Sequence, residues 1–328
     1  LIDLNIDSDQ TLNGQIQTCE ISNIEYLSID NYAISNFDGL QYFTGLRSFY
    51  LENNQTPTFH TIDFSGNPLL EYLTIDNTPR LFNVNVTQNS ALIEANIRTG
   101  AGSFDGVDFT GNNNLIVLNL SGNIGLANIQ FALNSNLQFL NLSSTSAFNV
   151  DLSNFPNLSS LQMSDIFSLS TIDLSQNDQI TSLYFDNSGL DEINLSNLAQ
   201  LSYLRINNTD IKLLDISNNP VLSYLAADNN QELEMANLKN GYNDSMLVFL
   251  GNSPNLFCAL VDDEVYSQNA TLWYEDDTSI YTDDSICGKD AIDETVFFDG
   301  VGNQDDVIAW LDNNGNAITY GPEDLIWD

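Results

Sequence analysis

Short runs of alternating apolar and polar residues recur along most of this chain. Residues 201–221 read LSYLRINNTDIKLLDISNNPV, and residues 222–242 begin again with LSYL. In the first copy Leu201, Leu204 and Ile206 alternate with polar neighbours, and a second apolar run ends at an Asn–Asn–Pro turn. Such alternation is typical of a strand with one buried face, and Asn, Gly or Pro after it is typical of a turn. Each copy therefore predicts two short strands separated by turns.

The copies follow one another at a nearly constant interval. Successive starts lie between 21 residues (Leu137 to Leu158) and 25 residues (Leu222 to Leu247) apart. One copy cannot bury its own apolar face, but stacked copies can, so the pattern predicts a solenoid. The copies start at Ile24, Leu46, Leu70, Leu92, Leu115, Leu137, Leu158, Ile180, Leu201 and Leu222, with a partial copy at Leu247.

The spacing L-x-x-L-x-L-x-x-N in unit after unit resembles the leucine-rich-repeat family. More narrowly, it resembles the short, internalin-like, double-stranded repeats of secreted proteins from Bacteroidota, in which a second half reads L-x-x-L-D-L-S-x-N. The resemblance covers roughly residues 24–288. It implies a mainly β solenoid of about ten to eleven turns, with two short strands per repeat, two parallel sheets and little helix. For function it implies a recognition scaffold.

The same pattern suggests four segments along the chain. We expect an N-terminal cap at 1–23, the repeat solenoid at 24–246, and a C-terminal cap at 247–288. Residues 289–328 carry two apolar runs around Gly and Asn turns, which predict strands of an extra β module or the start of a following domain. The chain is therefore expected to be part of a longer protein.

The first 23 residues carry a row of oxygen-bearing side chains. Four Asp or Asn residues fall at every second position, followed by Asn13–Gly14 and an acidic residue, as a calcium loop of the EF-hand kind needs. The stretch also resembles the D-x-N-x-D-G-x-I-x-x-x-E cap found before such repeats, except that residues 8–12 lengthen the loop. A plain acidic capping loop is the alternative. Calcium is the one candidate cofactor, with the ligands Asp3, Asn5, Asp7, Asp9 and Glu20.

The C-terminal cap of the resembled family implies a disulfide. In that family a Cys in the last strand pairs with one further along the chain, and Cys258 and Cys287 match these positions. A bridge that closes the exposed end of a solenoid suits an oxidising compartment. Cys19, the remaining one of the 3 cysteines, is expected to be a buried or unpaired thiol.

The charge of the chain limits its partners. With 7 Lys+Arg against 45 Asp+Glu, the formal net charge is -38, which disfavours nucleic acid and anionic membrane surfaces. Cations, basic partners and neutral glycans remain compatible, and high acidity also keeps a secreted protein soluble. No apolar run approaches the roughly 20 residues of a membrane span. We therefore expect a secreted or surface-associated protein with no membrane insertion.

Residues between the inward leucines of each first strand point outward, and stacking aligns them into columns. Two aromatic and charged clusters result, separated by a run of amides and hydroxyls. Tyr side chains beside carboxylates and Arg are typical of surfaces that bind sugar rings or a protein partner. The alternative is that Tyr occurs here because it has high strand propensity and packs well across strands. The clusters are Tyr184, Tyr203, Tyr224, Arg205, Asp186 and Asp228, and Tyr26, Tyr50, Tyr72, Asp30, Glu52 and Asp76.

The second strand of each repeat presents a column in which Asp and Asn alternate, beside a column of hydroxyls. Asp151 and Asp173 are its one adjacent acidic pair. Hydrogen bonds along the stack are one explanation of the column; a cation at that pair, or a hydroxyl array facing a glycan or ice, is the other. The acidic column runs Asp63, Asn85, Asp108, Gln130, Asp151, Asp173, Asn194, Asp215 and Asn237.

Catalysis finds little support. His60 is the sole histidine, no His/Cys cluster offers a zinc site, and no Gly-rich phosphate loop leads from a strand into a helix. We therefore expect no catalytic residues. The sequence predicts a recognition or adhesion module that binds a glycan or a protein through the first-strand face. The alternative is a structural segment of an extracellular filament or surface layer that self-associates.

Overall fold

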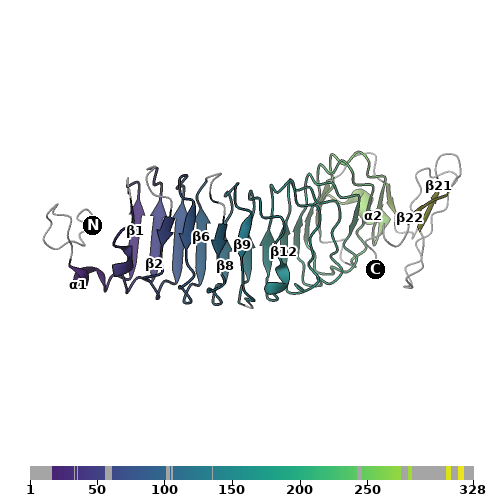
Figure 1. Cartoon of the computed structure of the whole chain (residues 1–328). Helices are drawn as coiled ribbons and strands as arrows, with labels where there is room; N and C mark the ends of the chain where they lie inside the picture. The colour runs from purple at the N-terminus through teal and green to yellow at the C-terminus, as the bar shows by residue number, and fades with distance from the viewer. Residues whose placement is uncertain are drawn as a thin grey trace. The chain divides into compact units, whose positions relative to one another are not determined.

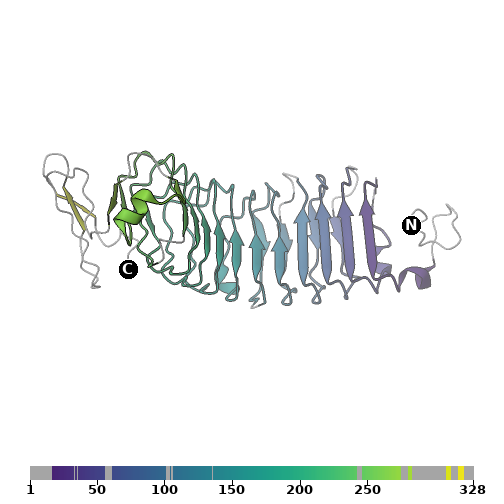
Figure 2. The same cartoon turned by 180° about the vertical axis from the view of Figure 1, so that it is seen from behind.

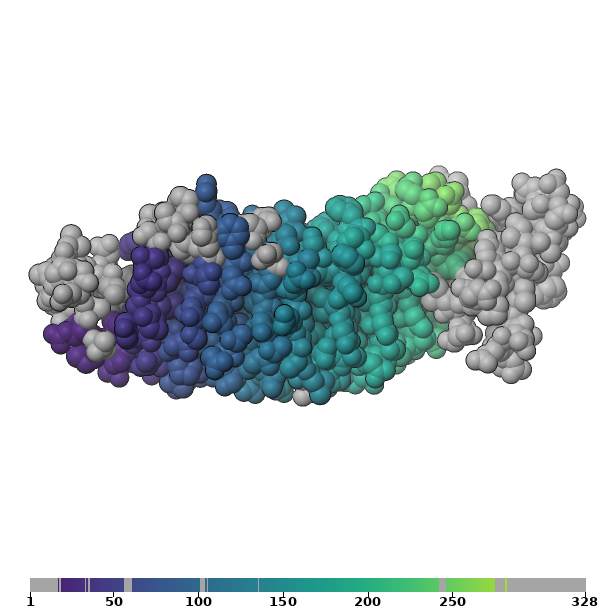
Figure 3. Space-filling view, in the orientation of Figure 1, coloured from purple at the N-terminus to yellow at the C-terminus, as the bar shows by residue number. Residues whose placement is uncertain are grey.

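The computed structural model describes residues 17–274 except 33, 35, 56–60, 101–103, 105, 135 and 242–245, and also the strands at 280–282, 308–311 and 317–320. The chain divides into two compact units, Leu1–Ile166 (unit 1) and Phe167–Asp328 (unit 2). In the space-filling view of Figure 3 the repeats of unit 1 form consecutive bands of colour, as expected where each repeat packs on its neighbours in sequence.

The first strands of unit 1 form one parallel sheet, in which β1, β2, β6 and β8 can be followed side by side in Figure 1. Leu118 pairs with Leu140 and Leu140 with Leu161, and all three side chains are buried. The period-2 alternation therefore places the apolar side chains inward, as predicted. The strands, in sheet order, are β1 (Tyr26–Asp30), β2 (Ser48–Glu52), β4 (Tyr72–Asp76), β6 (Glu94–Arg98), β8 (Val117–Asn119), β10 (Phe139–Asn141) and β11 (Ser160–Gln162).

In the described part of unit 1 the second strands pair two by two. β3 pairs with β5 and β7 with β9, and a short 3-10 helix, η2 (Leu152–Asn154), replaces the next strand. Asp151 caps η2 by accepting hydrogen bonds from the N–H and hydroxyl of Ser153 at 3.1 and 2.6 Å. Such local bonds compete with strand pairing, so this column is interrupted rather than continuous. Its strands are β3 (Thr61–Asp63), β5 (Asn83–Asn85), β7 (Gly106–Asp108) and β9 (Asn128–Gln130).

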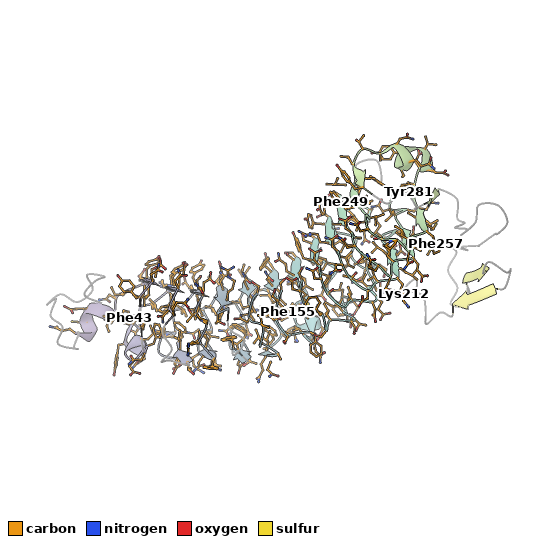
Figure 4. The ribbon with its side chains drawn as sticks, turned by 90° about the horizontal axis from the view of Figure 1, so that it is seen from above. Phe43, Phe155, Lys212, Phe249, Phe257 and Tyr281 are labelled. Atoms are coloured by element: carbon orange, nitrogen blue, oxygen red, sulfur yellow. The ribbon has the colours of Figure 1, made fainter. Side chains whose placement is uncertain are left out.

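Unit 2 repeats the arrangement with two parallel sheets. The first strands are β12 (Ser182–Tyr184), β13 (Tyr203–Arg205), β15 (Tyr224–Ala226), β17 (Leu247–Phe249) and β19 (Trp273–Tyr274), and the second strands are β14 (Leu213–Asp215), β16 (Met235–Asn237), β18 (Cys258–Leu260) and β20 (Ile280–Thr282). Figure 4 shows Phe249, of the first-strand sheet, and Phe257, next to β18, on opposite sides of this unit. The predicted fold class is confirmed: the chain is mainly β, a parallel solenoid of about eleven turns.

Helix is scarce in the part of the chain that is described. It comprises α1 (Thr18–Ile21), η1 (Leu40–Tyr42), η2 and α2 (Glu264–Asn269), the last drawn in green in Figure 2. None of the described helices has the length and apolar character that crossing a bilayer requires. β21 (Ile308–Leu311) and β22 (Ala317–Tyr320) pair in antiparallel fashion, within the segment for which an extra β module was predicted.

Buried asparagines connect successive repeats at one corner of the solenoid. Asn89 Nδ2 donates to the carbonyls of Phe64 and Asn67 at 3.0 and 2.6 Å, and Asn112 Nδ2 donates to those of Val86 and Asn89 at 3.0 and 2.8 Å. Buried backbone carbonyls require such partners. Asn89 and Asn112 are therefore structural, which removes them from the candidates for ligand binding.

The turn after most first strands contains one residue with a left-handed backbone, and this residue is usually Asn. Asn187, Asn208 and Asn229, for example, have φ values of 57°, 54° and 62°. Asn tolerates this region better than most residues, and Gly100 and Gly122 occupy it in unit 1. The turns predicted from Asn and Gly are therefore confirmed by the backbone.

The predicted N-terminal cap lies largely outside the described residues, and the end of the predicted C-terminal cap does too. Of the proposed calcium ligands, Asp3, Asn5, Asp7 and Asp9 are outside them, and Glu20 lies in α1. Cys258 is disulfide-bonded and Cys19 is free and exposed. Cys287, the predicted partner of Cys258, is outside the described residues. Calcium binding and the Cys258–Cys287 pairing stay predictions.

Candidate binding face

Five aromatic side chains on the first-strand sheet of unit 2 form a continuous series of ring contacts, called here the aromatic ladder. They come from the five consecutive strands β12, β13, β15, β17 and β19. Tyr203 and Tyr224 are directly paired across β13 and β15, and Phe249 and Tyr274 across β17 and β19. The other two steps, Tyr184–Tyr203 and Tyr224–Phe249, run diagonally between neighbouring strands. Diagonal neighbours lie within reach of aromatic side chains. The ladder comprises Tyr184, Tyr203, Tyr224, Phe249 and Tyr274.

The geometry of the ladder alternates between stacked and tilted pairs. Tyr203 and Tyr224 stack with centroids 4.3 Å apart and an interplanar angle of 4°, as do Phe249 and Tyr274 at 4.9 Å and 7°. The pairs Tyr184–Tyr203 (5.1 Å, 31°) and Tyr224–Phe249 (5.7 Å, 46°) are tilted. Except for Tyr274, which is 53% exposed, the rings are half-buried. The ladder is therefore ordered by its own packing.

A charged group lies beside the ladder. The Arg205 guanidinium forms an ion pair with Asp186 at 2.6 Å, and the two side chains are 40% and 15% exposed. The second oxygen of Asp186 accepts hydrogen bonds from the backbone N–H and the side-chain amide of Asn207 at 3.1 and 2.8 Å. Asp228 accepts from the Gly251 N–H at 2.8 Å. Both predicted carboxylates thus hold neighbouring repeats together, and Arg205 keeps an exposed edge.

The hydroxyls of Tyr184 and Tyr224 stay protonated well above neutral pH. Burial raises the pKa of Tyr184, with a further contribution from Tyr203, while Arg205 acts in the opposite direction. Burial also raises the pKa of Tyr224, helped by a hydrogen bond with Tyr203. Near neutral pH these groups are therefore neutral hydroxyls that donate and accept hydrogen bonds.

The cluster predicted in unit 1 is smaller. Tyr26 and Tyr50 are in contact, with centroids 5.3 Å apart at 39°, and burial, followed by Tyr26, raises the pKa of Tyr50. Tyr72 is 37% exposed. The acidic row beside them, Asp30, Glu52 and Asp76, occupies paired strand positions, and Asp76 is ion-paired with Arg98.

The acidic column of the second strands differs from the predicted arrangement. Hydrogen bonds along the stack were expected, and Asn85 Nδ2 does donate to Asp63 at 2.8 Å. Most of these side chains instead cap their own turn: the Ser175 N–H donates to Asp173 at 2.9 Å, which lowers the pKa of that carboxyl. Asp215 accepts from the Ser217 N–H at 2.8 Å, although burial raises its pKa. The carboxylates occur here because they stabilise turns.

Metal and catalytic chemistry find no support among the residues that the structure describes. No three His, Cys, Asp or Glu side chains there come together as a metal ion requires. His60, the sole histidine, lies outside them. The absence of catalytic residues therefore stays a prediction.

Sequence reasoning found three rungs of the ladder and missed two. Phe249 and Tyr274 continue it because β17 pairs with β15 and β19 with β17. The signal was present: Val248 and Trp273, the residues before these two rings, are the buried, directly paired positions. The Trp273 Nε1 group donates to the Met246 carbonyl at 3.2 Å, which fixes the strand so that Tyr274 points outward.

Comparisons with known proteins place the chain beside bacterial repeat proteins of low sequence identity. The functional domain of InlJ from Listeria monocytogenes is 18% identical, with 94% of this chain and 77% of that one covered and a TM-score of 0.40. The internalin InlF from the same species is 16% identical, with 84% and 89% covered and a TM-score of 0.40. YopM from Yersinia enterocolitica is 18% identical, with 73% and 60% covered and a TM-score of 0.42.

No protein-family model and no curated protein sequence matches the chain. Similarities of the size found among solved structures carry no argument about function. The functional argument therefore rests on this chain's own surface.

Proposed function

We propose that the first-strand face of unit 2 is a recognition surface for a polypeptide, anchored on the aromatic ladder. The observation that carries this proposal is the unbroken series of five rings on consecutive strands. Aromatic side chains and Arg are enriched among the residues that dominate protein–protein affinity. A row that is already packed loses little conformational entropy when a partner binds.

The orientation of the rings favours a polypeptide over a glycan at this face. Sugars stack on the flat faces of aromatic rings, and in the Tyr203–Tyr224 and Phe249–Tyr274 pairs each ring covers a face of the other. The ladder can then present ring edges and hydroxyl groups to a ligand. Ring edges carry partial positive charge and attract carbonyl oxygens and the faces of other aromatic rings, both of which a polypeptide supplies.

The charge of the chain favours a basic partner. A formal charge of -38 accelerates encounter with a cationic polypeptide and repels acidic ones. We further propose an extracellular setting, supported by the disulfide-bonded Cys258, since such bonds persist in oxidising compartments.

A random-peptide library displayed on phage and selected on the wild-type protein tests the proposal. Selected peptides are then measured by calorimetry against the wild type, Tyr203→Ala and Tyr224→Ala, with Ser182→Ala as the matched control on β12. We expect enrichment of peptides with basic and aromatic residues. A ladder ring that is an affinity hot spot should lose at least about 2 kcal/mol on truncation, roughly thirtyfold in Kd.

Two results would oppose the proposal. Peptides that bind both Tyr variants as tightly as the wild type would place recognition elsewhere and leave the ladder as strand packing. Concentration-dependent self-association that both Tyr variants abolish would instead make this face a contact between copies, as the structural-filament alternative requires. Size-exclusion chromatography over a range of concentrations distinguishes that case.

A further inference from the structure

A shallow groove of about 490 Å³ lies on unit 1, along the carboxyl ends of its first strands. Its lining comes from β4, β6, β10 and β11 and from the turns that follow β4, β6, β8 and β10, and it shares no residue with the aromatic ladder. The side chains used in the argument below are Asp76, Arg98, Ser121, Asn141, Ser143 and Gln162.

The groove exists because side chains are short where the strands end. Ser121 and Ser143 lie two residues beyond Asn119 and Asn141, the last residues of β8 and β10. Gly100 and Gly122 occupy the neighbouring turns with φ of 67° and 78°, and a Cβ placed on either would meet no atom within 4 Å. Arg98 and Asp76, which are longer, border the groove at one end. The groove therefore results from the short residues that the sequence places at the ends of successive strands.

The groove offers hydrogen-bond donors that no other described group uses. Gln162 Oε1 accepts from Asn141 Nδ2 at 2.8 Å, which leaves the Gln162 Nε2 group for a ligand. Ser143 Oγ accepts from the Ser164 N–H at 3.1 Å, which leaves its hydroxyl proton. Among the described residues no hydrogen bond uses the Ser121 hydroxyl. A ligand for this groove must therefore supply acceptor oxygens.

The groove is also close to electrically neutral. Its two charged side chains, Arg98 and Asp76, form an ion pair with each other. An anion would meet a guanidinium that is already neutralised and a chain of strongly negative charge. A cation would find the amide oxygens of Asn141 and Gln162 engaged, the former by the Ser143 N–H at 2.9 Å. The groove therefore favours a neutral ligand over an anion or a cation.

An extended peptide lacks its usual mode of binding here. Peptides that bind β-sheets commonly add a strand at an open edge. β4, β6, β8 and β10 are each paired on both sides, so the sheet offers no backbone donors along the groove. A ligand in the groove must therefore be bound by side-chain amides and hydroxyls.

From these observations we propose that the groove on unit 1 binds a neutral saccharide. Its hydroxyl and ring oxygens accept hydrogen bonds from Ser121, Ser143 and Gln162. Sites of this kind use a few placed polar groups to set orientation and specificity. The site is separate from the proposed polypeptide face, and either can fail without the other.

The test uses a printed panel of neutral oligosaccharides (glucose, mannose, galactose and N-acetylglucosamine oligomers) beside acidic ones and the peptides selected on the ladder. The strongest neutral binder is then titrated calorimetrically. Gln162→Glu keeps the acceptor for Asn141 and removes the free donor, and should weaken binding up to about tenfold, the value of one hydrogen bond. Ser121→Leu fills the groove and should weaken binding more than Gln162→Glu does.

Controls separate this site from general effects. Ser160→Ala, on β11 but outside the groove, and Tyr203→Ala, on the ladder, should both bind the saccharide like the wild type. If Ser121→Leu unfolds the protein, Gln162→Glu remains the deciding variant. The proposal is overturned if no neutral saccharide on the panel binds, if acidic saccharides or the selected peptides compete for the groove more strongly than neutral ones, or if Gln162→Glu binds unchanged.

Discussion

The first-strand sheets of the two units share one backbone plan and differ in the surface they present. In β10 of unit 1 and β13 of unit 2 the central residues, Leu140 and Leu204, are equally buried. The flanking outward residues are Phe139 and Asn141 in β10 but Tyr203 and Arg205 in β13. The inward period therefore determines the scaffold, while the outward positions are free to determine what is bound.

The outward columns are also ordered by different forces. In unit 1, polar side chains hydrogen-bond along the stack, as Asn141 does with Gln162. In unit 2, rings pack on rings over five strands. The polar neighbours line a groove, whereas the packed rings form a continuous aromatic surface. The same repeat thus supports two kinds of recognition chemistry.

The largest effect should come from positions at which the units do not differ. Leu140→Ala and Leu204→Ala each remove a fully buried side chain, and each should lower the free energy of unfolding by about 2–5 kcal/mol. Denaturant titration measures both. If only one variant lost stability, the interiors of the two units would not be equivalent, and the idea of a shared backbone plan would be contradicted.

The next effect should separate the units. Tyr203→Ala removes ring contacts to Tyr184 and Tyr224 at 5.1 and 4.3 Å, each worth about 0.5–1.5 kcal/mol, and should therefore destabilise by about 1–3 kcal/mol. Ser160→Ala, at the corresponding position of β11, should stay within about 0.5 kcal/mol. Equal stabilities of the two variants would mean that the ladder contacts do not stabilise the fold.

Much of this organisation could be predicted from the sequence. Inward leucines such as Leu183 and Leu204 define the strands. When apolar residues alternate with polar ones and one face is buried, only one choice of inward-facing residues buries the apolar side chains. Tyr184, Tyr203 and Tyr224 fall on one face by the same reasoning. Whether their rings contact one another depends on side-chain rotamers and on pairing across neighbouring strands, which periodicity does not specify.

Two features lay beyond the sequence pattern for identifiable reasons. Phe249 and Tyr274 lie where the repeat length changes, after Leu222, so the predicted column ended two strands too early. The groove of unit 1 depends on which side chains are short and which hydrogen bonds are already made, for example at Ser121 and Gln162. The turn-capping role of Asp173 was hidden because a carboxylate in a column looks the same whether it caps a turn or binds a cation.

A smaller effect concerns the ion pairs beside each face. Arg205→Met and Arg98→Met remove the partners of Asp186 and Asp76, and partly exposed pairs contribute about 0.2–1 kcal/mol. Arg205→Met should cost more, because its partner Asp186 is 15% exposed whereas Asp76 is 33% exposed. Thermal unfolding at low and high salt measures the difference, and the reverse order would contradict this ranking.

The smallest effect concerns alkaline pH. Tyr184 and Tyr224 have pKa values raised above the ordinary 10.0, so the unfolded chain ionises first as the pH rises. Their contribution to stability is complete below pH about 10 and is lost as the pH rises through the folded-state values. Unfolding followed below and above pH about 10 should show a shallower loss in Tyr224→Phe, which keeps the ring and removes the titrating hydroxyl. An unchanged slope would contradict the assignment.

The central claim is that the aromatic ladder of unit 2, and not the tyrosine cluster of unit 1, contacts a polypeptide partner. Hydroxyl-radical footprinting of the complex with a peptide selected on the wild-type protein tests this claim most directly. Oxidation of Tyr184, Tyr203, Tyr224 and Tyr274 should fall when the peptide binds, while that of Tyr26 and Tyr72 stays unchanged. Protection of Tyr26 and Tyr72 with undiminished oxidation of the ladder would contradict the account.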